Sequence, residues 1–282
     1  MESTLAEADI AERVTGVAVD TGTERMIARK DGAIGWLIFN NPARRNAVST
    51  DMWAAIPKAV AAFESDPAIR VVIVTGAGDK AFVSGADISQ FESNRANPED
   101  NEQYQRISGE GSGALGRLSK PSIAMIRGFC IGGGLAVALT ADIRIAAEGS
   151  HFAIPAAKLG LGYNYPGIAT LVSLVGPAYA REIMFTARQF DGEEALRMGL
   201  INRLVKLGDL EATCRECAAM IGANAPLTVK AAKMAINAAV RDESRRDIDK
   251  VEEAVNACFA SADYKEGRAA FMEKRTPKFQ GK

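Results

Sequence analysis

Two glycine-containing turns hold the residues whose types and spacing suit chemistry at a carbonyl oxygen. One turn, Gly132-Gly133-Gly134, follows the apolar run 122–126 and opens an apolar helical pattern. The other, Ser84-Gly85-Ala86-Asp87, comes shortly after the β-branched run 71–75. Backbone N–H groups are unpaired at such strand-to-helix turns, where the helix also carries partial positive charge. Two turns of this kind can direct two N–H donors at one oxygen and stabilise an oxyanion that develops from a carbonyl.

The glycine triplet suits an oxyanion better than a phosphate. The pattern Gly-x-x-x-x-Gly-Lys-Ser/Thr is absent, and Gly-x-Gly-x-x-Gly is not matched either. A second interpretation also fits the triplet, namely a glycine turn that packs tightly under a helix because no side chain has room there. The triplet alone leaves both interpretations open.

The elements that would position these turns alternate between strands and helices. Residues 26–40 predict a hairpin with its turn at Asp31-Gly32, and Ser49 or Thr50 caps the helix that follows. Strands followed by helices at this rhythm indicate an α/β fold. From residue 209 onward only helical patterns occur. We therefore expect a flexible polar tail over 1–25, a core over 26–205 and a C-terminal helical region over 206–282.

Composition excludes several classes of protein. The chain has 282 residues, 48% of them hydrophobic, and a net charge of -1. That length can bury a sizeable core, and the near-neutral balance argues against nucleic acid as the partner. No run approaches the ~18 apolar residues of a membrane span, and the start lacks a secretory pattern. These features predict a cytoplasmic protein that binds neither nucleic acid nor membrane.

The cysteines do not predict a metal or redox site. Cys214 and Cys217 have suitable spacing, but there is no second pair and His151 is the only histidine. The surrounding sequence reads as helical. We expect cysteines that are simply buried or on the surface, no metal, and a structural role for His151.

Taken together, the two turns resemble the two oxyanion-hole loops of the crotonase (enoyl-CoA hydratase/isomerase) superfamily. The resemblance runs from about Met26 to Lys282. Residues 41–47 look like the family's first CoA-contacting turn, and residues 271–275 look like its C-terminal signature. The resemblance implies an α/β fold built as a spiral of ββα units. It also implies a C-terminal helical region through which subunits form a homo-oligomer, either a trimer or a hexamer made of two trimers.

The resemblance also implies a site for an acyl-CoA. The amides of Ala86 and Gly133 would form the oxyanion hole for its thioester. The family's contacts with the CoA part would fall on Arg44, Ala47, Ser84, Asp87, Ile88, Phe271 and Lys274. Phe271 and Lys274 can serve a neighbouring subunit, while Arg44 and Lys274 also fit simple surface charges. CoA belongs to the substrate, so no separate cofactor is expected.

This chain departs from the family at the two positions that carry acid–base chemistry. Hydratases of the superfamily use one glutamate two positions after the glycine triplet and another directly after a Phe-x-x-Pro element. Here these positions are Ala136 and Ala156. Alanine has no proton to give or take, so ordinary hydration or isomerisation is not expected.

A different reaction of the superfamily fits the remaining residues. The run 159–168 and the tail from residue 262 resemble those of methylmalonyl-CoA decarboxylases, whose pocket tyrosine would map to Tyr163. Those enzymes place a histidine where this chain has Ala86. We expect a lyase of acyl-CoA or fatty acid metabolism that favours decarboxylation or C–C cleavage, although overall similarity gives it the label enoyl-CoA hydratase. The alternatives are hydration with Tyr163 or Asp87 as acid or base, and a catalytically silent oligomer that binds acyl-CoA.

Overall fold

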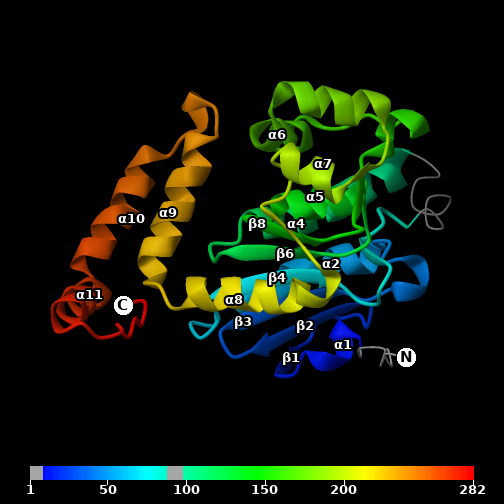
Figure 1. The fold of residues 1–282 in the computed structure, drawn as a ribbon. Coiled ribbons are helices and arrows are strands. Elements are labelled where there is room, and N and C mark those ends of the chain that lie inside the picture. The colour runs from blue at the N-terminus through cyan, green and yellow to red at the C-terminus, as the bar shows by residue number, and fades with distance from the viewer. Residues whose placement is uncertain (1–8, 88–97) are drawn as a thin grey trace.

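Two β-sheets form the centre of the molecule in the computed structural model, which describes residues 9–87 and 98–282. The larger sheet has the strand order β1 (Val17–Val19), β2 (Met26–Asp31), β3 (Ile34–Phe39), β4 (Val71–Gly76), β6 (Ser122–Ile126), β8 (Ile143–Ala147), β11 (Arg203–Val205). The smaller sheet has the order β10 (Phe190–Asp191), β9 (His151–Ala153), β7 (Phe129–Ile131), β5 (Ala81–Val83). Figure 1 shows the helices arranged around both sheets.

The helices follow the strands in the order expected of an α/β chain. They are α1 (Ile10–Arg13), α2 (Thr50–Glu64), α4 (Pro98–Gly116), α5 (Gly133–Thr140), α6 (Tyr165–Thr186), α7 (Gly192–Arg197), α8 (Leu210–Gly222), α9 (Pro226–Ala239), α10 (Ile248–Ala260) and α11 (Ala262–Glu273). Short 3₁₀ helices include η1 (Pro42–Arg44), η3 (Pro155–Leu159) and η5 (Glu243–Arg245).

The larger sheet is buried on both faces, which explains its continuous apolar strands. Strands β3, β4, β6, β8 and β11 run parallel to one another, as is usual where helices cover both sides, while β2 pairs antiparallel with β3. Side chains of β3 alternate between the faces: Leu37 and Phe39 join the cluster under α2 and α5, and Trp36 and Ile38 join the cluster under α1 and α8.

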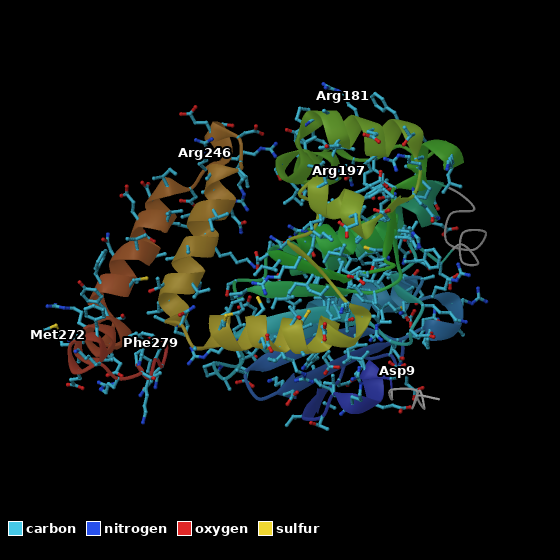
Figure 2. All side chains as sticks on the ribbon, in the orientation of Figure 1. Asp9, Arg181, Arg197, Arg246, Met272 and Phe279 are labelled. Atoms are coloured by element: carbon cyan, nitrogen blue, oxygen red, sulfur yellow. The ribbon has the colours of Figure 1, made fainter. Side chains whose placement is uncertain are left out.

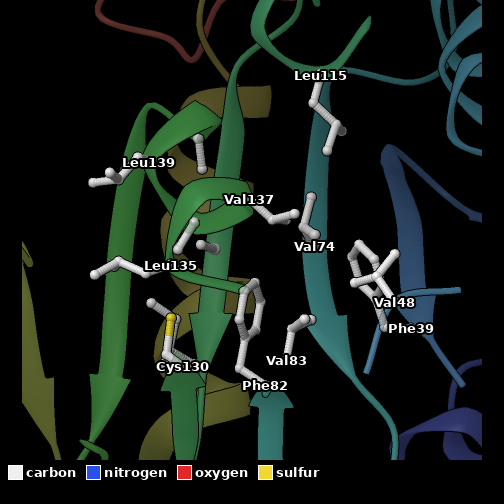
Figure 3. Packing of buried hydrophobic residues seen from close by; sticks show 14 of the residues in the cluster. Phe39, Val48, Val74, Phe82, Val83, Leu115, Cys130, Leu135, Val137 and Leu139 are labelled. Atoms are coloured by element: carbon white, nitrogen blue, oxygen red, sulfur yellow. The ribbon is translucent and has the colours of Figure 1, made fainter. Parts of the chain in front are cut away.

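The smaller sheet fixes the relative position of the two glycine turns. Its strands β5 and β7 are parallel, with Val83 paired to Cys130. Their carboxyl ends therefore lie at the same edge, and the segments that follow both strands begin there. Figure 3 shows Phe82 and Val83 near Cys130, with Leu135 of α5 in the same packed cluster.

The expected tail over 1–25 contains regular structure in its described part. Within the described residues it forms α1 and then β1, which pairs antiparallel with β2. Ile10 and Val14 are buried at 0% and 1% exposure against the α8 side of the larger sheet. Asp9 anchors the start, since both of its carboxylate oxygens accept from the N–H of Gly78, at 2.9 and 2.8 Å. The segment is thus held by two buried apolar residues, by the Asp9 carboxylate and by the pairing of β1 with β2.

The C-terminal helices divide into one that packs on the core and three that project from it. Helix α8 buries Leu210, Cys214 and Cys217 against the larger sheet. Helices α9, α10 and α11 form an arm beside the core (Figure 1), and α10 buries none of its residues. In Figure 2, Arg246 lies at the end of the arm where α9 connects to α10, and Met272 lies at the opposite end, on α11. The C-terminal helical region expected over 206–282 thus divides by packing into α8, which lies on the core, and the arm that begins after it.

One described helix, α6, has the length and apolar composition of a membrane span. The chain leaves helical geometry inside it, at Gly176 with φ 71° and ψ 168°, just before Pro177. A span needs about 20 consecutive apolar helical residues. Because the break divides α6 into two shorter helices, its length is weak support for a membrane segment.

Candidate active site

The two glycine turns meet as the sequence predicted. A Cβ built on Gly133 would lie 3.6 Å from the amide nitrogen of Ala86, so the two backbones approach closely at the edge of the smaller sheet. Gly134 makes this approach possible: a Cβ there would lie 1.9 Å from the carbonyl oxygen of Val83. The turn thus needs glycine at 134 for packing, which means that both interpretations of the triplet hold at different positions.

Both candidate donors are unused by the backbone of the described residues. Gly85 accepts from the N–H of Val48 at 2.8 Å, and the N–H of Asp87 donates to Val48 at 3.0 Å, which leaves the Ala86 N–H between them without a carbonyl. Gly133 is the first residue of α5, where N–H groups have no intrahelical partner. Gly132 turns the chain with φ 54°. The geometry offers two N–H donors to one oxygen.

Four of the predicted CoA contacts lie in the loops around this pair of donors, which we call the candidate oxyanion hole. The N–H of Ala47 donates to Arg44 at 3.1 Å, and the hydroxyl of Ser84 donates to the same carbonyl at 3.4 Å. The guanidinium of Arg44, 57% exposed, lies 3.5 Å from the carboxylate of Asp87. Asp87 is buried and does not line the cavity described below, so it shapes this loop and is poorly placed as an acid or base.

Sequence reasoning missed Asn46, which holds these loops together. Its side chain is fully buried, donates to Ala77 at 2.8 Å and Ala81 at 2.9 Å, and accepts from the N–H of Asn41 at 2.9 Å. Its backbone is left-handed, with φ 56°. Asparagine tolerates that conformation better than most residues, and this was the available signal.

A cavity of about 1120 Å³ opens in front of the hole. Its walls come from the two turns, from α4 and α5, from the η3–α6 segment and from one face of α9. Ser84, Ala86, Gly133 and Tyr163 are among the lining residues. The volume exceeds what a small substrate needs, and the walls near the hole are largely apolar, as is typical of ligand sites.

Ala136 and Ala156 both line this cavity. Among the described lining residues the one carboxylate is Asp142. It accepts from the N–H and the hydroxyl of Ser122, at 2.8 and 3.0 Å, and pairs with Lys233 at 2.7 Å. Through these partners the Asp142 carboxylate holds α9 against the core.

Tyr163 is the ionisable side chain that the cavity holds between η3 and α6. Its ring lies against Gly167, where a Cβ would come within 3.2 Å of it, and Asn164 caps α6 by accepting from the N–H of Gly167 at 3.3 Å. Burial raises the pKa of Tyr163, because the anion would lose its hydration. The phenol therefore keeps its proton at neutral pH and can donate it in a hydrogen bond.

The remaining predicted residues lie elsewhere. Phe271, 82% exposed, and Lys274 belong to the far end of the arm and do not line the cavity of their own chain. Ile88 lies outside the described residues. His151 is part of β9 and stacks on Phe129 with ring centroids 5.6 Å apart, which fits the structural role expected of it.

The cysteine pair lies buried in α8. Cys214 and Cys217 are buried free thiols, and burial raises the pKa of Cys214 to about 12. Within residues 9–87 and 98–282, no three histidine, cysteine or acidic side chains are grouped as metal ligands would be.

Comparison with known proteins identifies the family. The family model described as enoyl-CoA hydratase/isomerase matches residues 29–282. The chain belongs to the enoyl-CoA hydratase/isomerase family. Membership makes it an enzyme of the crotonase superfamily that processes acyl-CoA, and it confirms the predicted fold.

Several members of the enoyl-CoA hydratase/isomerase family are similar over nearly their whole length. The short-chain-enoyl-CoA hydratase of Clostridium acetobutylicum is 36% identical, over 89% of this chain and 95% of the relative. The crotonyl-CoA hydratase of Syntrophomonas wolfei is also 36% identical, over 92% and 99%. The crystal structure of an enoyl-CoA hydratase/carnithine racemase from Magnetospirillum magneticum superposes with a TM-score of 0.85 at 35% identity, over 92% and 97%. These relatives carry no decarboxylase name, so they do not support the expected closeness to methylmalonyl-CoA decarboxylases.

Proposed function

We propose that this enzyme transforms an acyl-CoA through a thioester enolate, by a reaction that needs no pair of carboxylates. The observation that carries the proposal is the lining of the cavity. Ala136 and Ala156 border it, and its one described carboxylate, Asp142, is tied to Ser122 and Lys233. Decarboxylation or a related C–C cleavage meets this condition best.

In the proposed reaction the thioester oxygen accepts from the amides of Ala86 and Gly133. The bond between the α-carbon and the departing carboxylate breaks, and its electron pair moves through the α-carbon onto the thioester oxygen as an enolate. Each amide donor contributes about 2.7–4 kcal/mol to such a transition state, judged from the removal of single donors in other enzymes. Carbon dioxide leaves, and the α-carbon then takes a proton from water or from Tyr163.

Tyr163 is the proposed orienting group. Its partly buried phenol stays protonated and can donate to the carboxylate that leaves, holding it out of the plane of the thioester. Along the rim, the proposed neighbours of the CoA part are Arg44, Ala47, Ser84 and Asp87. Ile88 is proposed with them from the sequence alone. Phe271 and Lys274 are proposed to serve the site of an adjacent subunit, since they are remote from their own.

Hydration is the second candidate, and the hydratase names of relatives at 36% identity favour it. Hydration would require Tyr163, or water alone, to carry out the proton transfers that two glutamates perform in hydratases of the superfamily. A silent oligomer that binds acyl-CoA is the third.

Parallel assays with crotonyl-CoA and methylmalonyl-CoA, followed by mass spectrometry, separate the three candidates. We expect carbon dioxide and propionyl-CoA from methylmalonyl-CoA, and loss of that product in Tyr163→Phe. Hydration of crotonyl-CoA at a rate typical of an enzyme would instead establish the second candidate. Binding of both esters without turnover of either would favour the third.

A further inference from the structure

The cavity in front of the candidate oxyanion hole extends far from it. Its lining includes Gly133 at the start of α5 and Thr140 at the end of that helix. Because an α-helix rises about 1.5 Å per residue, Thr140 lies about 10 Å along α5 from Gly133. Of the described residues proposed to contact CoA, Ser84 alone lines this cavity. Most of its length is therefore left for the acyl group.

Helix α4 runs along the cavity in the direction that leads away from the hole. A Cβ on Gly111 would lie 2.7 Å from the carbonyl oxygen of Trp53, which belongs to the first turns of α2. The segment just before α2 forms the bridge to Ala86. Beyond the end of α4, the hydroxyl of Ser119 donates to Glu64, the last residue of α2, at 2.7 Å. Since α2 begins beside the hole, the carboxyl end of α4 is its distant end.

The face of α4 that lines the cavity carries small residues. The lining positions recur every three or four residues, which is one face of a helix. After Gln105 this face consists of Ser108, Gly109, Ser112, Gly113 and Gly116. A Cβ built at Gly109 or at Gly116 meets no atom of the described residues within 4 Å. An acyl chain can lie in the room that ordinary side chains would fill.

Apolar side chains line the distant end of the cavity. They include Leu139 of α5 and Val229 and Ala232 of α9. Val229 and Ala232 are three positions apart and so share one face of α9. The ammonium of Lys233 in the same helix donates to Asp142 at 2.7 Å and to the carbonyl of Lys120 at 2.9 Å. The charge at this end is thus paired, and apolar surface is left for a chain to contact.

We propose that the acyl group is a chain of about eight carbons or more that extends from the hole along α4 and α5 toward α9. A C–C bond is about 1.5 Å long, so a path of about 10 Å holds at least about seven carbons beyond the thioester carbon. The substrate class is then a medium- or long-chain acyl-CoA. The assignment rests on the proposed acyl-CoA site and adds to it the length of the acyl group.

Binding of CoA esters with saturated chains of four, six, eight and ten carbons tests this length. Calorimetric Kd values are measured for wild type, Gly116→Leu and the matched control Gln103→Leu. Gln103 is an exposed residue of α4 that does not line the cavity. Leucine is a better helix former than glycine and meets open space at position 116, so we expect Gly116→Leu to fold.

The expected result is a wild-type Kd at least about tenfold lower for octanoyl-CoA than for butyryl-CoA, because each buried methylene strengthens binding. Gly116→Leu should raise the Kd of octanoyl-CoA by about tenfold and leave that of butyryl-CoA within about twofold, since the new side chain occupies only the distant part of the path. Gln103→Leu should change neither value. If Gly116→Leu does not fold, Ser112→Leu on the same face of α4 takes its place.

Two results would overturn the proposed chain length. One is a wild-type Kd that stays constant or rises from four to eight carbons, which leaves the acyl-CoA site intact but limits it to short chains. The other is a Kd that falls with chain length in wild type and equally in Gly116→Leu and Ser112→Leu, because the chain then follows another path. Failure of wild type to bind any of the four esters refutes the acyl-CoA site itself.

Discussion

Two alanines underlie the chemistry that we propose for the cavity. Ala136 lies one turn into α5 from Gly133, and Ala156 lies in η3, so the two border the cavity from different elements. A carboxylate at either place would reach toward a substrate held at the hole. Their small size leaves room there and removes proton transfer by a carboxylate.

Restoring the carboxylates should therefore create hydratase activity. In Ala136→Glu combined with Ala156→Glu, we expect crotonyl-CoA hydration to rise by about 10²-fold or more, the usual contribution of general acid–base catalysis. Absorbance of the enoyl thioester measures the rate. Each single variant is the control and should gain less than the pair. A double variant no faster than wild type would show that other groups already perform the proton transfers.

The protonation state of Tyr163 gives a second prediction at this scale. Burial favours the neutral phenol, so the pKa of Tyr163 lies above the ordinary value of about 10. The donor form thus persists as the pH rises from 7 to 9, and activity that depends on it should not fall over that range. A pH–rate profile checks this. An alkaline decline below pH 9 that disappears in Tyr163→Phe would contradict the assigned protonation state.

The sequence points to Ala86 and Gly133 as candidates but not to Asn46. Ala86 and Gly133 belong to glycine turns whose spacing resembles a known family, so their proposed role follows from a linear pattern. The importance of Asn46 comes from two carbonyls more than 30 positions away in the chain. Such a relation exists only after folding.

At the scale of elements, the proposed oxyanion hole results from the contact between β5 and α5. The carboxyl ends of β5 and β7 set the two turns side by side, and Gly134 lets α5 touch β5. Neighbouring glycines in this turn have different tasks. Gly134 serves packing, while Gly133 keeps the space before the Ala86 amide open.

Alanine substitutions should separate these tasks. Gly133→Ala should fold normally, because its φ is not left-handed and its nearest contact is 3.6 Å. The added methyl would obstruct the Ala86 amide, so kcat should fall by about 10²-fold or more, as on loss of one oxyanion donor. Gly134→Ala should instead lose about 1–3 kcal/mol or more of unfolding free energy, since its Cβ would meet the Val83 carbonyl at 1.9 Å.

Denaturant unfolding and steady-state kinetics on the same preparations test both statements. Equal loss of stability in the two variants would argue against a separate role for Gly133.

The order of strands and helices was predictable because apolar runs and caps are local features. The packing of α8 on the core was harder to predict, because a helical pattern in the sequence does not indicate which element covers the apolar face of the helix.

At the scale of the molecule, the C-terminal arm is the part that a single chain leaves uncovered. Ile236, Val255, Phe259, Phe271 and Met272 are each at least 40% exposed. Its described ionic tie to the core is Lys233, which reaches Asp142 at 2.7 Å and the carbonyl of Lys120 at 2.9 Å. Exposed apolar side chains in this number are typical of a surface that another protein covers.

We expect a second and third copy of the chain to cover the arm. Light scattering should give a mass of three or six times the 29.9 kDa of one chain. Val255→Glu combined with Phe271→Glu should lower that mass, because burying unpaired carboxylates in an interface is costly. Asn256→Glu, which adds charge at an exposed polar position of α10, is the matched control and should not lower the mass.

If Lys274 serves a neighbouring site, the dissociated protein should also bind CoA esters more weakly, although its own hole is intact. A monomeric wild type with full ester affinity would contradict both the oligomer and the assignment of Phe271 and Lys274 to a shared site.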